Sequence, residues 1–380
     1  MATAELVSSK LVDFLNASPT AFHVVDEVKR RLKKVGFEQV LEREDWNLEL
    51  GKKYFFTRNH STIVAFAIGK RYVARNGFRI IGAYTDSPCL KLKPTSKVAK
   101  GGYLEVGVQT YGGGLWHTWF DRDLTVAGRL IVKEMKDGSV SYTDKLIRIQ
   151  EPIMWIPTLA IHLDIYALAK TWLNTQSHLV PILATSVKNG PIDAKFKIDG
   201  IKSHDKKIID DRKHHSIFLQ TEEICDFELQ LCDTPQSIIG CALKEFIFSG
   251  RLDNLCMSFC SLKALIDSTS FESSLDEEIG VRMVALFDHE ELVDKAIQQS
   301  FLVSADMAHA IHPNHMDKHE DNHQPKLHGG LGIKHNANQR YATNAITSFI
   351  FREIAERHDL PIQVIYFSAK DYISLSNGLC

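Results

Sequence analysis

The chain has 380 residues, of which 44% are hydrophobic and 24% are charged, and its formal net charge is -2. This composition is ordinary for a soluble protein, and the length exceeds what one hydrophobic core usually supports, so we expect two domains. A net charge this small provides no field that would attract nucleic acid or an anionic membrane surface, and we expect neither as a partner.

Two features of the sequence indicate a cytoplasmic protein. The first twenty residues lack the basic start and apolar run of a signal peptide, and no segment approaches the ~18 apolar residues of a membrane span. The seven cysteines are odd in number and include no CxxC pair, which favours reduced thiols. Cys256 and Cys260 lie four residues apart in a predicted helix and could share a metal, although two small core residues are the simpler interpretation.

The amino-terminal part of the chain has an α/β pattern. Helices are predicted over residues 4–17 and 21–34, and buried strands over the apolar, β-branched runs at 61–69 and 78–84. Gly36 is typical of a residue that ends a helix, so we expect the second helix to stop there.

The middle of the chain has a different pattern. From about residue 94 short alternating runs and glycine turns predict antiparallel β structure, with one helix predicted over 158–173. The charged stretch 188–215 predicts a solvated loop. After Ile239 the α/β pattern returns, with helices predicted over 254–267 and 343–358 and strands over 281–287, 301–306 and 361–367. An α/β domain with a mostly parallel sheet, interrupted by a β-rich insert, explains this order more simply than two sequential domains.

Acidic residues stand at or just past the ends of the predicted strands. They are Asp86, Asp253, Glu290, Glu291 and Asp306. In an open, mostly parallel sheet such ends gather in one crevice, where clustered carboxylates repel one another unless cations hold them. We therefore predict a divalent-metal site. Because Glu290 and Glu291 are consecutive, their side chains point in different directions, so one could bind metal while the other acts as a general base.

Other site patterns are absent or weak. The sequence contains no GxSxG, P-loop, GxGxxG or HExxH motif. The histidine-rich run AHAIHPNHMDKHEDNHQPKLH at 308–328 has irregular spacings and no cysteine, which do not match a closed structural zinc site. We expect most of these histidines to cap turns and helix ends, and only His309, three residues after Asp306, to lie near the crevice.

Seven segments together resemble the aspartyl aminopeptidase family of co-catalytic zinc exopeptidases. They are GAYTDSPCLKLKP, GGGLWHTWFDRDLTVAGR, SGRLDNL, ALFDHEE, SADMAHAIHPN, DKHEDNHQP and KHNANQRYAT. The resemblance implies a zinc-peptidase-like catalytic domain formed by residues 1–93 and 237–380, with an oligomerisation domain inserted at 94–236. It also implies a dodecameric homo-oligomer that removes amino-terminal Asp or Glu from peptides.

The resemblance assigns a role to each acidic residue. Asp253 looks like the carboxylate that bridges two zinc ions, with Asp306 a ligand of one ion and Glu291 a ligand of the other. Glu290 resembles the general base that activates water, and Asp86 the acid that orients a metal-bound imidazole.

The family's substrate pocket has counterparts at four further positions. They are His117, His309, Lys334 and Tyr341. By the same resemblance His117 would reach the site of a neighbouring subunit, and the cationic Lys334 would suit an acidic substrate side chain.

The sequence departs from the family pattern in three places. Tyr84 stands where the family has a zinc-binding histidine, and a phenol is a poor zinc ligand at neutral pH unless the metal deprotonates it. After Glu291 the family has a glycine- and serine-rich loop, whereas this sequence continues with LVDKAIQQSFLV. The family's other metal histidine lies near its carboxyl terminus, and the closing segment SAKDYISLSNGLC has no match to it.

These departures would remove the imidazole from each zinc ion. The oxygen ligands Asp253, Glu291 and Asp306 that remain favour magnesium, manganese or calcium, so we expect reduced or absent zinc binding. Three interpretations stay open: a metallo-aminopeptidase with impaired activity, a non-catalytic subunit in a mixed oligomer with intact homologues, and an incomplete splice product. Whether His309 or His312 replaces a missing ligand also stays open.

Overall fold

The computed structural model describes residues 2–136, 139–160, 162–163, 174–185, 208–210, 215–217, 224–288, 301–305, 307, 310–316, 324–336 and 345–367. The chain divides into two compact units, Met1–Ala305 and Asp306–Cys380.

The first unit begins with two helices, α1 (Ala2–Ala17) and α2 (Ala21–Lys34). Both were predicted, and α1 starts two residues earlier than expected. After α2 the chain turns at Gly36, whose φ of 84° lies in the left-handed region that favours glycine.

A six-stranded sheet follows these helices and has the order β1-β2-β3-β15-β4-β16. Its strands are β1 (Glu38–Gln39), β2 (Lys53–Arg58), β3 (Thr62–Ile68), β4 (Phe78–Tyr84), β15 (Val281–Phe287) and β16 (Phe301–Ser304). The pairs β1–β2, β15–β4 and β4–β16 are parallel, whereas β3 runs antiparallel to both of its neighbours. The predicted mostly parallel sheet is therefore confirmed.

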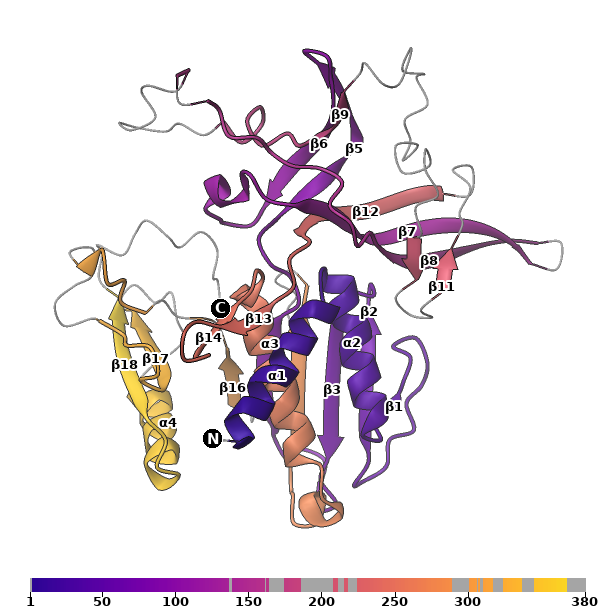
Figure 1. Cartoon of the computed structure of the whole chain (residues 1–380). Coiled ribbons are helices and arrows are strands. Elements are labelled where there is room, and N and C mark those ends of the chain that lie inside the picture. The colour runs from indigo at the N-terminus through magenta and orange to yellow at the C-terminus, as the bar shows by residue number, and fades with distance from the viewer. Residues whose placement is uncertain are drawn as a thin grey trace. The chain divides into compact units, whose positions relative to one another are not determined.

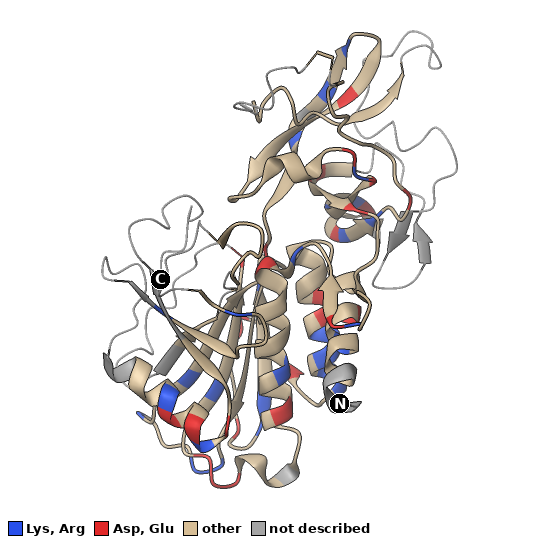
Figure 2. Cartoon of the chain, turned by 60° about the vertical axis from the view of Figure 1, so that its left-hand side comes forward, with Lys and Arg blue, Asp and Glu red and all other residues tan. Residues whose placement is uncertain are grey.

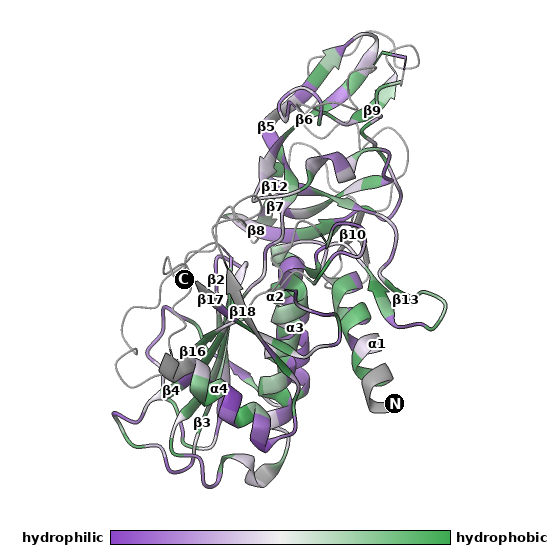
Figure 3. Ribbon diagram, turned by 90° about the vertical axis from the view of Figure 1, so that its left-hand side faces the viewer, coloured by the Kyte–Doolittle hydropathy of each residue, from purple (hydrophilic) through white to green (hydrophobic). Residues whose placement is uncertain are grey.

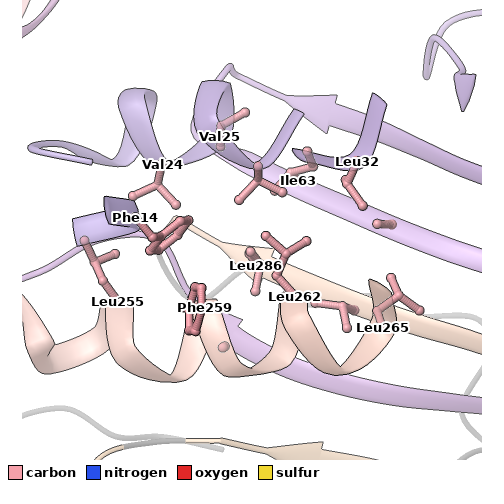
Figure 4. Close-up of a cluster of buried hydrophobic side chains, with 14 of the residues drawn as sticks. Phe14, Val24, Val25, Leu32, Ile63, Leu255, Phe259, Leu262, Leu265 and Leu286 are labelled. Atoms are coloured by element: carbon pink, nitrogen blue, oxygen red, sulfur yellow. The ribbon is translucent and has the colours of Figure 1, made fainter. Parts of the chain in front are cut away.

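Apolar residues cover both faces of this sheet. Helices α1, α2 and α3 (Leu252–Ser268) lie against one face (Figure 1). There Phe14 and Phe259 are buried in one cluster (Figure 4), which also includes Phe55. On the other face Phe66 packs with Tyr54, their ring centroids 5.8 Å apart. Because side chains alternate between faces, β3 is buried along its whole length. Figure 3 shows the same concentration of hydrophobic residues in the strands of this sheet.

An eight-stranded sheet occupies the middle of the chain, in the order β11-β10-β8-β7-β12-β5-β6-β9, with every neighbouring pair antiparallel. Its strands are β5 (Cys89–Lys100), β6 (Tyr103–Tyr111), β7 (Leu124–Lys136), β8 (Ser139–Arg148), β9 (Ile182–Thr185), β10 (Ile208–Asp210), β11 (His215–Ile217) and β12 (Ile224–Asp233). The predicted antiparallel β structure is confirmed.

Two predictions for this middle region need correction. The stretch 188–215 was expected to be a loop, yet β10 lies within it, because a strand of three residues between charged segments leaves little periodic signal. In the helix predicted over 158–173, residues 158–160 and 162–163 are not helical, and the rest lies outside the described residues.

The connection back to the first sheet carries a small hairpin, β13 (Ile238–Gly240) and β14 (Phe246–Phe248). Two 3-10 helices, η1 (Trp116–Trp119) and η5 (Glu272–Leu275), complete the first unit's described helices and strands. The second unit contains the parallel strands β17 (Leu331–Asn336) and β18 (Ile362–Phe367) and helix α4 (Ala345–Arg357), which confirms the last predicted helix and strand.

The described residues carry charges of both signs. Figure 2 shows both Lys or Arg and Asp or Glu on the helices. Among the described residues, no helix has the length and apolar character needed to cross a membrane.

Candidate functional site

The carboxyl ends of β4 and β15 lie side by side. The backbone N–H of Thr85 donates a hydrogen bond to the carbonyl of Phe287 (2.8 Å), and the Thr85 hydroxyl donates one to the carbonyl of Ser61 (2.8 Å). The N–H of Asp288 donates to Oγ1 of Thr62 (2.9 Å). These bonds hold the segments that follow both strands at one edge of the sheet, where parallel α/β sheets bind ligands.

Helix α3 brings a second acidic segment to the same edge. The side-chain amide of Asn254 donates a hydrogen bond to the carbonyl of Asp86 (3.2 Å), and the buried hydroxyl of Ser258 donates one to the carbonyl of Tyr84 (2.5 Å). Asp253 directly precedes Asn254 through a cis peptide bond, and its side chain is exposed. The structure therefore brings together three predicted site positions from two distant parts of the sequence.

The start of α3 is held by charged groups. Arg251, with a φ of 61°, donates from Nη1 to Oδ1 of Asp233 (3.2 Å), and Arg122 donates to the other oxygen of the same carboxylate (2.6 Å). Asp253 follows in non-helical backbone (φ -84°, ψ 108°). The ion pairs of Asp233 thus anchor the turn from which the Asp253 carboxylate projects.

Tyr111, which was not predicted as a site residue, fixes the carboxylate of Asp86. The hydroxyl of Tyr111 donates to Oδ2 of Asp86 at 2.5 Å, and Nζ of Lys91 lies 3.7 Å from the centre of the Tyr111 ring. Burial, the hydrogen bond to Asp86 and the charges of Asp86 and Asp288 all raise the pKa of Tyr111. The phenol therefore stays protonated and keeps donating to Asp86 over the physiological pH range.

The other predicted site residues are spread over the chain. His117 lies in η1 with an exposed side chain, and Lys334 lies in β17 of the second unit, where its ammonium donates to the carbonyl of Met307 (3.0 Å). Five predicted positions fall outside the described residues: Glu290, Glu291, Asp306, His309 and Tyr341.

Part of the histidine-rich run behaves as predicted. Nδ1 of His312 accepts a hydrogen bond from the N–H of Asn314 (3.2 Å), and the rings of His312 and His315 are 4.8 Å apart. His312 therefore caps a turn, as the irregular spacing indicated.

The donors that the structure describes at this edge are oxygen atoms. Tyr84 offers a phenol, one Asp86 oxygen already accepts the Tyr111 hydroxyl, and Asp253 offers a carboxylate. Within the part of the chain that the structure describes, no three His, Cys, Asp or Glu side chains come together as a metal site. Oxygen donors of this kind suit magnesium, manganese or calcium better than zinc.

Comparison with known proteins relates this architecture to a family. A castor bean (Ricinus communis) protein described as "Probable aspartyl aminopeptidase" is 62% identical, the match covering 94% of this chain and 83% of that protein. The structure of the Ape4 and Nbr1 complex matches with a TM-score of 0.85 and 39% identity, covering 97% of this chain and 76% of that chain. The S. cerevisiae mApe1 dodecamer matches with a TM-score of 0.78 and 25% identity, covering 96% of this chain and 86% of that chain.

The match to a family model is equally extensive. The model described as "Aminopeptidase I zinc metalloprotease (M18)" matches residues 14–295 and 292–372, which together make up most of the chain. The mixed α/β fold, with its mostly parallel sheet and separate antiparallel sheet, agrees with the matched structures. The chain belongs to the aminopeptidase I zinc metalloprotease (M18) family.

Proposed function

We propose that this metallo-aminopeptidase family member acts on peptides with an amino-terminal Asp or Glu, and that its activity is impaired. The 62% identity to the castor bean protein over 94% of this chain is the main support for this substrate class. The hydrogen bond from Asn254 to Asp86 supports a shared site, because it brings the start of α3 to the end of β4.

Each acidic residue has a separate role in this proposal. Asp253, Glu291 and Asp306 would hold the metal, and zinc, when bound, would supply Lewis-acid chemistry. Glu290 would accept the proton of the attacking water as general base. Asp86 would orient a neighbouring ligand, with its own carboxylate fixed by the Tyr111 hydroxyl.

The substrate would be held by residues from other elements. His117, His309, Lys334 and Tyr341 would line the pocket, and the Lys334 ammonium would pair with the acidic side chain of the substrate. His117 would act in the site of a neighbouring subunit. In this proposal residues 1–93 and 237–380 form the catalytic domain, and residues 94–236 form the oligomerisation domain.

Two observations support impaired activity. Tyr84 stands at the end of β4 in place of an imidazole, and a phenol binds zinc poorly at neutral pH. The family model matches in two pieces that meet at residues 292–295, and the castor bean alignment of 406 residues is longer than this chain. The relative therefore carries residues inside the aligned region that this chain lacks, which supports a missing segment after Glu291.

One protein preparation tests the proposal. Metal content per chain is measured by mass spectrometry after dialysis, and hydrolysis of an aspartyl peptide is measured with added zinc or manganese. We expect fewer than two zinc ions per chain and weak turnover. Two tightly bound zinc ions with brisk turnover would contradict the impairment, and hydrolysis that prefers a neutral amino-terminal residue would contradict the substrate class.

A pair of variants isolates the contribution of position 84. Tyr84→His restores an imidazole and should raise zinc affinity about tenfold or more, a magnitude typical of changes at a metal site. Tyr84→Phe removes only the hydroxyl and should bind no more zinc than the unaltered chain. Equal zinc affinity in the two variants would show that position 84 does not face the metal.

The dodecameric relative favours a second candidate function. The S. cerevisiae mApe1 structure is a dodecamer, so this chain could join a mixed oligomer with intact homologues and contribute no working metal pair. Co-expression with a tagged, intact aspartyl aminopeptidase tests this, since a non-catalytic subunit would co-purify in the same large assembly. Failure to co-purify would exclude it.

The two-piece family match also fits an incomplete splice product. Reading the genomic sequence around residue 291 for a skipped exon would identify that origin.

A further inference from the structure

Two buried cysteines lie at matching positions on neighbouring strands. Cys89 is the first residue of β5 and Cys232 is the last but one of β12. The strands are antiparallel with Gln230 opposite Lys91. Extending this register brings Cys232, two residues after Gln230, opposite Cys89, two residues before Lys91. Directly opposed residues have Cα atoms about 4.5–5.5 Å apart, within the roughly 4.4–6.8 Å that disulfides require.

The two cysteine side chains also share one face of the sheet. The neighbouring residues Leu90 and Leu231 both belong to a single buried apolar cluster. Because side chains alternate along a strand, Cys89 and Cys232 project together to the opposite face. Each is only 3% exposed, and after burial the proximity of Cys232 is one of the causes that raise the pKa of Cys89. The register, the shared face and the burial therefore place the two sulfur atoms close together on the same side of the sheet.

The position of this pair in the fold gives it structural importance. All eight strands of the antiparallel sheet come from residues 89–233, so the chain enters the sheet at Cys89 and leaves it just after Cys232. Cys89 also lies opposite Tyr111 on its other side, and Tyr111 holds the carboxylate of Asp86. A bond between the cysteines would join the sheet's two connections beside the candidate site.

We propose that Cys89 and Cys232 form a cross-strand dithiol that a hydroperoxide converts to a disulfide, closing the eight-stranded sheet into a covalent loop. One sulfur attacks the peroxide, forming an S–O bond and breaking the O–O bond, and water or an alcohol leaves. The second sulfur attacks the resulting sulfenic acid, forming the S–S bond and breaking the S–O bond, and the hydroxyl leaves as water with the thiol proton. The two thiols lose two electrons and the peroxide gains them.

The reactivity of this pair contrasts with that of Cys256 and Cys260. Burial raises the pKa of Cys89 to about 12 and that of Cys232 to about 11, so few thiolates form at neutral pH and oxidation is slow. The hydrogen bond from Cys256 lowers the pKa of Cys260 to about 7. Cysteines four apart on a helix have Cβ atoms about 5–6 Å apart, too far for a disulfide, which needs about 3.5–4.5 Å. Cys260 should therefore oxidise faster without forming a bond to Cys256.

The test uses the full chain treated with hydrogen peroxide at pH 7 and pH 9. Free thiols are then blocked under denaturing conditions, and peptides are analysed by mass spectrometry without reduction. The Cys256→Ser/Cys260→Ser double variant removes the two thiols of α3, including the low-pKa thiol of Cys260, and Cys232→Ser is the matched control. We expect a linked Cys89–Cys232 peptide that dithiothreitol cleaves, forming about tenfold or more faster at pH 9, and absent from Cys232→Ser.

A second measurement detects the covalent loop through its effect on unfolding. Oxidation of the Cys256→Ser/Cys260→Ser variant should raise the thermal midpoint, because the disulfide restricts the unfolded chain, whereas the same treatment of Cys232→Ser should not. The proposal is overturned if neither pH gives the linked peptide, or if Cys89 links to a different cysteine. It does not depend on the proposed peptidase activity, since neither readout requires bound metal or substrate.

Discussion

The two sheets of the first unit are stabilised differently. The six-stranded sheet packs its larger apolar cluster against α1, α2 and α3 and has a smaller cluster around Phe66 on its other face. The two clusters of the eight-stranded sheet, one around Leu90 and a smaller one around Leu130, are built from buried residues of its own strands and loops. Polar groups link the two parts: Arg148 donates to the carbonyl of Asn16 (2.6 Å) and Gln230 to that of Pro19 (3.1 Å). Apolar burial thus stabilises each sheet, while side-chain hydrogen bonds to backbone carbonyls align one with the other.

The largest effect is expected at the centre of the helical layer. Phe259 is buried with its ring 5.6 Å from that of Phe14, so Phe259→Ala should lower the free energy of unfolding by about 3–5 kcal/mol, as measured by urea denaturation. Phe271 is 75% exposed, and Phe271→Ala should change it by less than about 0.5 kcal/mol. Similar losses in both variants would contradict the assignment of the core.

A smaller loss is expected in the eight-stranded sheet. Leu130 is fully buried but belongs to a cluster of few residues, so Leu130→Ala should cost about 2–3 kcal/mol. Met135 lies on the same strand with 67% of its side chain exposed, and Met135→Ala should be nearly neutral. Hydrogen exchange decides the comparison: faster exchange in β7, β8 and β12 alone would show that the sheets unfold separately, whereas faster exchange throughout would show one cooperative unit.

The next largest effect on stability is expected at Glu27, a buried carboxylate in α2, and this effect should depend on pH. Burial alone would raise the pKa of Glu27, but hydrogen bonds from Arg30 and Arg31 and their charges lower it below 4.5. Because the folded pKa is depressed, this stabilisation is present above pH 4.5 and is lost as the pH falls through the folded value. Glu27→Gln should cost about 1–3 kcal/mol at pH 7.

The pH profile separates this interaction from general acid sensitivity. In Glu27→Gln the loss of stability below pH 4.5 should be shallower than in the unaltered chain, as measured by urea denaturation at several pH values. Glu38 has a largely exposed side chain, so Glu38→Gln serves as the control and should leave the profile unchanged. If all three proteins had parallel profiles, Glu27 would not be the source of the pH-dependent loss of stability.

The smallest effect is expected between the two sheets. Arg129 donates to the carbonyl of Asn59 (2.8 Å), and its guanidinium carbon lies 4.5 Å from the centre of the Phe22 ring. Arg129→Gln should lower the free energy of unfolding by about 1 kcal/mol. The side chain of Arg71 makes an exposed ion pair with Glu277, so Arg71→Gln should have almost no effect. Equal effects would indicate that the contacts of Arg129 do not align the sheets.

The sequence predicted elements well where the apolar pattern was long. The strand over 78–84 and the helix over 21–34 were predicted with the observed bounds, because β-branched runs and helix end signals are local properties. β10 was missed because three residues carry no periodicity. Local signals thus defined the long elements but not the short ones that depend on pairing.

The candidate site was predictable only in part for a similar reason. Asp86 and Asp253 were identified because acidic residues at strand ends and helix starts are visible in a sequence. The contribution of Tyr111 was not, because its contact with Asp86 depends on the register between β5 and β6, which no local pattern specifies.

The hydrogen bond from Ser258 to the carbonyl of Tyr84 has an evolutionary consequence. It fixes the backbone at position 84 through an atom that every amino acid possesses, and Thr85 fixes the next residue in the same way. Exchange of the side chain at position 84 therefore leaves the scaffold in place. This position can change its side chain during evolution while the gene still encodes a protein that folds.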